Sequence, residues 1–178
     1  MEASPAKESR SSHPMESYLP RIESMLGEVI RQGGFELNFV IRKNEPREEE
    51  FEAPGYLVDF SGRDAELLLE KNAALLNAFE YVVLKGVRLE EELFTTITFD
   101  CQDWRRLRAR ELQLTAQVAA ERVVATGDPF PLGPMSARER RIIHLALKSQ
   151  PRVRTVSEGV GPDRKVVILP ASPPVPSR

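Results

Sequence analysis

The chain has 178 residues, of which 41% are hydrophobic, so it is long enough for one medium domain or two small domains with real cores. Its formal net charge of −2 conceals a division, because residues 1–103 carry 11 Lys and Arg against 21 Asp and Glu, whereas residues 104–168 carry 13 against 6. This asymmetry indicates that one half meets a polyanion and that the other half does not.

The sequence also argues against several classes of protein. Cys101 is the one cysteine, so no internal disulfide can form, and no cluster of Cys and His suggests a metal site. The first 14 residues are polar and lack the apolar core of a signal peptide. No apolar run approaches the roughly 20 residues that span a bilayer. We therefore expect a cytoplasmic protein with no integral membrane segment, no metal and no cofactor.

Residues 16–102 alternate between helical and strand periods. A first helix ends at Gly33 and Gly34, two strands follow on either side of a charged connection, and two helices precede a third strand, which gives the order α-β-β-α-α-β. The predicted elements are helix 16–33, strands 35–41 and 56–60, helices 64–69 and 72–87, and strand 95–99. Residues 1–15 and 171–178 are too polar or proline-rich to bury much surface, and we predict that both are disordered.

The second half of the sequence predicts two more helices and three short extended segments. Asp103 is the expected N-cap of a long helix that ends near Gly127. Ser136 and Glu139 have the spacing of a capping box, which starts a shorter helix before Pro151. The extended segments are 129–134, 153–156 and 165–169. The packing stripe predicted for the long helix consists of Trp104, Leu107, Leu112, Leu114, Val118, Ala119 and Val123. The predicted fold class is α+β, with two small domains.

The shorter helix presents two chemically different faces. Arg140 and His144 are four residues apart and therefore project together, with Arg141 and Lys148 in the same arc. The opposite arc consists of Ile142, Ile143, Ala146 and Leu147. One interpretation is that the cations and the imidazole contact phosphates. The other is that Arg140 and His144 are a structural pair, in which the arginine positions the histidine and the histidine supports the fold.

Residues 103–170 resemble an R-3-H domain, the module named for an arginine and a histidine with three residues between them. The matching stretch is 134–147, and residues 156–159 and 164–168 also resemble the family's pattern. The resemblance implies a nucleic-acid-binding domain made of helices packed on a small β-sheet. The predicted nucleic-acid-binding residues are Arg140, Arg141, His144, Lys148, Arg154, Arg164 and Lys165.

Residues 16–102 resemble the KH domain of the bacterial Jag family, also called SpoIIIJ-associated or KhpB proteins, in which a KH domain precedes an R-3-H domain. The predicted α-β-β-α-α-β order agrees with the type II KH arrangement. KH domains grip the nucleic-acid backbone with a G-x-x-G loop, but here Glu70 and Ala73 replace both glycines around Lys71 and Asn72. Side chains obstruct close approach of phosphate, and Glu70 repels it. We predict that this loop is degenerate.

These observations lead to two functional hypotheses. The first is a single-stranded RNA-binding or DNA-binding protein of the Jag type, in which the R-3-H domain contacts phosphates with little sequence selectivity and the KH domain is a scaffold or dimerisation module. The alternative is a protein-interaction adaptor whose KH domain binds itself or a small KH-only protein without contacting RNA. We do not expect an enzyme, because His144 has no nucleophile or carboxylate pair placed beside it by sequence.

Overall fold

The computed structural model describes residues 14–44 and 54–171. These residues form two compact units, and the boundary along the chain lies between Gln102 and Asp103. The predicted disordered segments lie mostly outside the described residues. Residues 14, 15 and 171 are exceptions, because Pro14–Ser17 forms the short 3-10 helix η1, Met15 is completely buried, and the Ala171 backbone N–H donates to the Arg152 carbonyl at 2.9 Å. The prediction of disorder up to residue 15 is therefore wrong at its end, since an apolar anchor at Met15 fixes the chain before the first α-helix.

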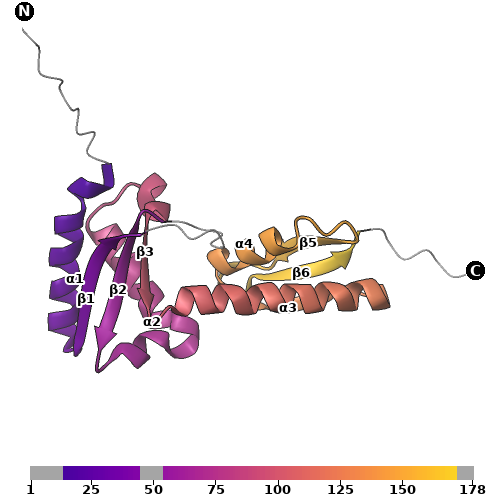
Figure 1. Cartoon of the computed structure of the whole chain (residues 1–178), viewed down its shortest axis with the longest axis horizontal. Coiled ribbons are helices and arrows are strands. Elements are labelled where there is room, and N and C mark those ends of the chain that lie inside the picture. Colours follow the sequence, from indigo (N-terminus) through magenta and orange to yellow (C-terminus); the bar gives the residue numbers. More distant parts are fainter. Residues whose placement is uncertain (1–13, 45–53, 172–178) are drawn as a thin grey trace, which may run out of the picture. The chain divides into compact units, whose positions relative to one another are not determined.

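The first unit is a three-stranded sheet with two long helical segments, as Figure 1 shows. Strands β1 and β2 are antiparallel, and β2 and β3 are parallel. The bounds of its elements are α1 Leu19–Gly33, β1 Leu37–Lys43, β2 Tyr56–Gly62, α2 Ala65–Gly86, the 3-10 helix η2 Glu91–Thr96 and β3 Ile97–Cys101. Because α2 contains four non-helical residues, 70–73, it consists of two helices. The predicted α-β-β-α-α-β order is confirmed.

Aromatic side chains form the centre of this unit. Phe60 on β2 makes an edge contact with Phe79 on α2, with ring centroids 6.0 Å apart, and Phe35 meets Phe79 at 5.5 Å. Strand β3 is buried along its whole length, although alternation had predicted a half-buried strand at 95–99. The residue before β3, Thr96, belongs to η2. Cys101 is a buried small side chain, and burial raises the pKa of its thiol.

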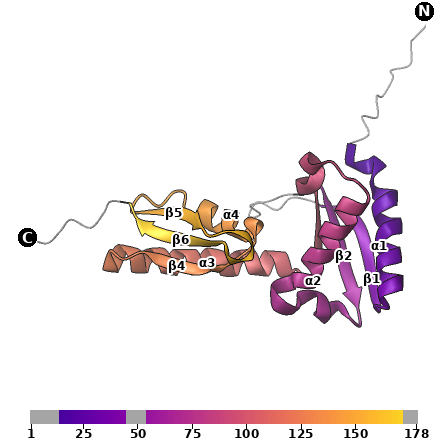
Figure 2. The ribbon, with the colours of Figure 1, turned by 180° about the vertical axis from the view of Figure 1, so that it is seen from behind.

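The second unit packs two helices on a three-stranded antiparallel sheet of order β4-β6-β5. Figure 1 shows α4 near β5, and Figure 2 shows β4 and β6 running along α3. The elements are α3 Trp104–Thr126, β4 Phe130–Pro134, α4 Ala137–Ala146, β5 Val153–Glu158, the 3-10 helix η3 Gly161–Asp163 and β6 Lys165–Pro170. Apolar side chains of both helices and of one sheet face form one core. The predicted α+β class is confirmed.

The packing face of α3 differs from the predicted stripe. Leu112, Ala119 and Val123 are buried as predicted, together with Ala116 and Ala120. In contrast, three members of the predicted stripe face solvent, with exposed fractions of 56% for Leu107, 63% for Leu114 and 67% for Val118. The physical reason is close packing, since a face of small alanines lets α3 approach the sheet and α4 more closely than a leucine face would.

The start of α3 also differs from the sequence prediction. Asp103 stands at the N-cap position, but its backbone is left-handed (φ 56°) and its side chain makes no capping hydrogen bond. The Asp103 carboxylate instead accepts from Arg106 Nη2 at 3.0 Å. The position of the helix start was correct, whereas the predicted capping role of the side chain was wrong.

Candidate nucleic-acid interface

The short helix α4 begins with the predicted capping box. Ser136 Oγ accepts from the Glu139 backbone N–H at 3.3 Å, and Glu139 Oε2 accepts from the Ser136 N–H at 2.9 Å. These two bonds satisfy orphan donors of the first turn. Glu139 has a second role that the sequence did not reveal. Its carboxylate, only 6% exposed, accepts from Arg108 Nε at 2.8 Å and so joins α4 to α3.

Packing of α4 fixes which of its side chains face outward. Ile142, Ile143 and Leu147 are buried in the core of the second unit, as the helical pattern predicted. Arg141 lies on the opposite side and is exposed, and so is Lys148, just after the helix end. The side chains of these two cations are therefore exposed to solvent.

His144 is held by the sheet. Its Nδ1 lies 2.6 Å from Thr155 Oγ1 and its Nε2 lies 2.9 Å from Ser157 Oγ. Both hydroxyls come from β5, where residues two apart point to the same face. Because both ring nitrogens are engaged within the unit, this geometry favours the structural interpretation of His144 over direct phosphate contact. The alternation of β5 is the signal that could have identified Thr155 and Ser157 from sequence.

The imidazole of His144 is kept neutral. Burial lowers its pKa from the ordinary value of 6.5, and the charge of Arg140 lowers it further. A neutral imidazole has one donor and one acceptor, so one hydroxyl can accept from it and the other can donate to it. This pair of hydrogen bonds fastens α4 to β5 near neutral pH.

Arg140 combines packing with charge. The side chain is half-buried, and its Nε is buried without a hydrogen-bond partner among the described residues. A buried donor left unpaired has an energetic cost. Arg140 therefore differs from Arg141, which is exposed. Part of the Arg140 side chain is packed within the second unit and so contributes to its structure.

Two of the remaining predicted cations, Arg154 and Lys165, do not join this surface. In β5 the helix-facing residues are Thr155 and Ser157, so Arg154 points to the other face of the sheet. Lys165 pairs in register with Glu158 and shares that other face, and Arg164 is exposed in the preceding turn. The seven predicted residues therefore do not all share one surface, and we define the α4 face as Arg140, Arg141 and Lys148.

The degenerate loop of the first unit has an unusual backbone. Glu70 is extended (φ −58°, ψ 152°), and Lys71, Asn72 and Ala73 are all left-handed, with φ of 48°, 63° and 56°. Such a conformation costs about 1–2 kcal/mol for each non-glycine residue. Glu70, Lys71 and Asn72 are exposed, while Ala73 is buried. The predicted loop residues thus occupy the junction of two helices, in a conformation that glycine would adopt more easily.

Within residues 14–44 and 54–171, no group of three or more His, Cys, Asp and Glu side chains could hold a metal ion. In the same part of the chain, no helix has the length and apolarity needed to cross a membrane.

Comparison with known proteins supports the assignment of the second unit. Residues 110–170, which make up most of this unit, match the R-3-H domain family. Relatives that match about three fifths of the chain include proteins named RNA-binding protein KhpB from three bacteria. The protein of Clostridium symbiosum is 32% identical over 111 residues, which cover 62% of this chain and 50% of the relative. That of Lactiplantibacillus plantarum is 32% identical over 120 residues, covering 62% and 37%. That of Bacillus subtilis is 31% identical over 110 residues, covering 61% and 53%.

The resemblance to the Jag or KhpB family predicted from the sequence is confirmed by these relatives. The chain spans about half, or less, of the length of each of them.

Proposed function

We propose that this protein binds single-stranded nucleic acid, RNA in particular, through its R-3-H domain. The observation that carries the proposal is the α4 face, where a capped and well-packed helix holds Arg141 and Lys148 outward. Exposed cations on a domain with a positive balance attract phosphates. The match to the R-3-H family and the name of the relatives, RNA-binding protein KhpB, support the same function.

The proposed contact is with the sugar-phosphate backbone. In this proposal His144 has a supporting role, because its bonds to Thr155 and Ser157 fix the helix that carries the cations. Arg140 lies beside His144 and reinforces its neutral state through its charge. Backbone contacts position a strand without reading its sequence. The contribution of Arg154 and Lys165 is smaller in this proposal, because they lie on the other face of the sheet.

A charge-matched pair of double variants tests the α4 face. Each phosphate contact adds about 0.7 to the slope of log K against log salt for single strands. Arg141→Gln with Lys148→Gln should therefore lower the slope for an oligouridine by up to about 1.4. Arg154→Gln with Lys165→Gln removes the same charge from the other face of the sheet and should lower the slope much less. Fluorescence anisotropy over a salt series measures both. Equal slopes in the two double variants would contradict the proposal.

In the same proposal the first unit is a scaffold. Its loop lacks both glycines, and the Glu70 carboxylate stands exposed where a phosphate would approach. Residues 1–103 also carry an excess of ten negative charges, which disfavours nucleic acid on this half. The proposal assigns no nucleic-acid contact to residues 70–73.

The second candidate function is that of a protein-interaction adaptor, with the first unit as the interface. The observation that favours it is a set of large apolar side chains left in water on this unit, since Val40, Tyr81 and Val82 are exposed. Such side chains, when contiguous, mark interaction sites. Size-exclusion chromatography with and without an oligouridine distinguishes the two functions. An oligomer that is indifferent to RNA favours the adaptor, whereas a monomer that shifts with RNA favours the first function.

A further inference from the structure

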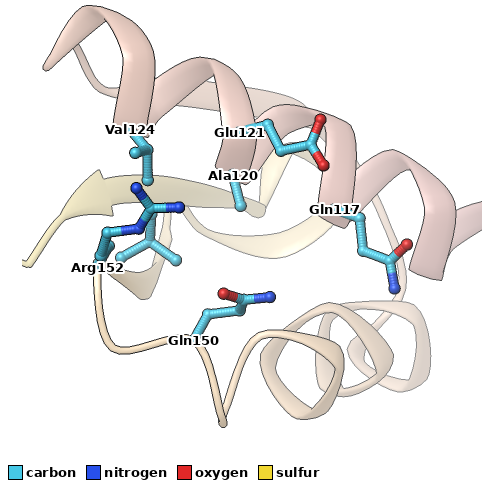
Figure 3. Close-up of a pocket in the computed structure, with 7 residues that line it drawn as sticks. Gln117, Ala120, Glu121, Val124, Gln150 and Arg152 are labelled. Carbon is cyan, nitrogen blue, oxygen red and sulfur yellow. The ribbon is translucent and has the colours of Figure 1, made fainter.

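A small pocket lies within the second unit, and its lining includes none of the three residues of the α4 face. It has a volume of about 130 Å³ and opens between α3 and the segment that leads from α4 into β5. Figure 3 shows the side chains of α3 on one side and those of Gln150 and Arg152 on the other. The lining residues are Gln117, Ala120, Glu121, Val124, Gln150, Arg152 and Val153. A volume below the 300–1,000 Å³ of ordinary small-molecule sites suits a single planar ring system.

The lining separates into an apolar floor and a polar rim. Ala120 and Val153 are buried core residues, and Val124 is half-buried beside them. Because Ala120 has only a methyl group, the floor leaves room above it. The rim residues are all exposed and comprise two amides, one carboxylate and one guanidinium, from Gln117, Gln150, Glu121 and Arg152. An apolar floor with a few polar groups around it is typical of a site for a small ligand.

The rim chemistry selects among occupants. A phosphate in the pocket would meet the Glu121 carboxylate, and like charges in contact repel. A nucleobase carries no such charge and offers a hydrogen-bonding edge. Among the four bases, guanine presents two adjacent donors, N1–H and the 2-amino group, which a carboxylate can accept together. Its O6 and N7 are acceptors that suit an arginine. Glu121 and Arg152 therefore supply the complement of guanine.

We propose that this pocket holds one unstacked guanine of the bound single strand. The proposal rests on the proposed function, since the phosphates on either side of that base would follow the α4 face. Lys148 stands only two residues before Gln150, so the backbone contacts and the pocket are adjacent along the chain. Single-stranded RNA is commonly read by bases turned out of the stack and bonded on their edges. The pocket would thus add one selective position to a contact that is otherwise unselective.

The test compares three oligonucleotides on the full-length chain. The first is a nine-nucleotide oligouridine, the second has guanosine at its centre, and the third has inosine there, which lacks the 2-amino group. By fluorescence anisotropy at one salt concentration, the guanosine form should bind about tenfold more tightly than oligouridine, as expected for one bidentate base contact. The inosine form should fall between them. Equal dissociation constants for the first two oligonucleotides would overturn the proposal.

A pair of variants locates the preference. Glu121→Gln removes the double acceptor from the pocket and should reduce the guanosine-to-uridine ratio at least threefold. Glu158→Gln removes the same charge from the far face of the sheet and should preserve the ratio. An unchanged ratio in Glu121→Gln, or an equal loss in both variants, would overturn the assignment to this pocket. Thermal unfolding of both variants establishes that they fold, which is expected because both side chains are exposed.

Guanosine, a nucleoside without phosphate, separates this inference from the proposed function. On titration with guanosine, but not with uridine, the amide resonances of Ala120, Glu121 and Val153 should shift in heteronuclear NMR spectra. If these shifts occur while no oligonucleotide binds, the pocket stands and the phosphate-binding role of the α4 face falls. If oligouridine binds with a steep salt dependence and no guanosine effect is seen in either assay, the proposed function stands and the pocket proposal falls.

Discussion

At the scale of single residues, His144 links the stability of the second unit to pH. Its folded-state pKa lies below the ordinary 6.5 because of burial and Arg140. Between these two pKa values the unfolded chain binds more protons, so the free energy of unfolding rises with pH. The stabilising contribution of neutral His144 is therefore complete above about pH 6.5 and is lost as the pH falls through the folded-state pKa.

The variant His144→Gln should remove this pH dependence. We expect the free energy of unfolding of the unmodified protein to fall as the pH drops from 7.5 toward 5, with a slope of at most about 1.4 kcal/mol per pH unit from this one group. Urea titrations at intervals of half a pH unit measure it. His13→Gln removes the chain's other histidine and is the matched control. A pH profile in His144→Gln as steep as that of the control would show that His144 is not responsible.

A second residue-scale prediction concerns the left-handed backbone at Lys71. Because its φ is 48°, replacement by glycine relieves a strain of about 1–2 kcal/mol, partly offset by the greater freedom of the unfolded glycine. Lys71→Gly should be neutral or stabilise the protein by up to about 1 kcal/mol. Ala78→Gly, at an exposed helical position of α2, should instead cost about 1 kcal/mol. Chemical denaturation of both variants compares them, and an equal loss would refute the strained loop.

At the scale of elements, the sequence predicted which helices and strands exist, and in what order, better than it predicted which face of each one is buried. Periodicity identified the α-helices and strands of the first unit but not its 3-10 helices, and the spacing of Ser136 and Glu139 identified the start of α4, because these signals are local. Periodicity misassigned the buried face of α3, because Leu107, Leu114 and Val118 recur at spacings that also suit a buried stripe. Which stripe is buried depends on the partners of the helix, and here the partners favour a surface of alanines. The bonds from His144 to Thr155 and Ser157 likewise span 11 and 13 residues. The alternation of β5 places the two hydroxyls on one face, but no local pattern places that face against His144.

The two faces of α3 can be compared by equal truncations. Leu112→Ala removes a buried side chain from the core and should cost about 2–5 kcal/mol of unfolding free energy. Leu114→Ala makes the same chemical change on the exposed face and should stay within about 0.5 kcal/mol of the unmodified protein. Denaturant midpoints at constant m-value report both. A large loss in Leu114→Ala would mean that this face is covered in solution, for example by a second copy of the chain.

At the scale of the whole molecule, the two halves of opposite net charge correspond to the two compact units. The core of the second unit draws its buried residues from Leu112 to Ile168 only, and the residues that surround it carry the positive balance of the chain. The sequence predicted this division because charge composition needs no knowledge of contacts. It could not place Arg154 and Lys165 on a different face from Arg141, since that depends on the register of β5 and β6.

Because core and charge reside together, a fragment of residues 103–178 should fold alone and bind nucleic acid. We expect a cooperative thermal transition for the fragment. We also expect a salt slope for oligouridine within about 0.7 of the full-length value, the contribution of one phosphate contact. Its affinity at low salt should exceed that of the full chain, because removing residues 1–102 removes an excess of negative charge. The matching fragment 1–102 should show no measurable binding under the same conditions. A folded fragment 103–178 whose slope is near zero would place the phosphate contacts in the first unit and reverse the proposed division of roles.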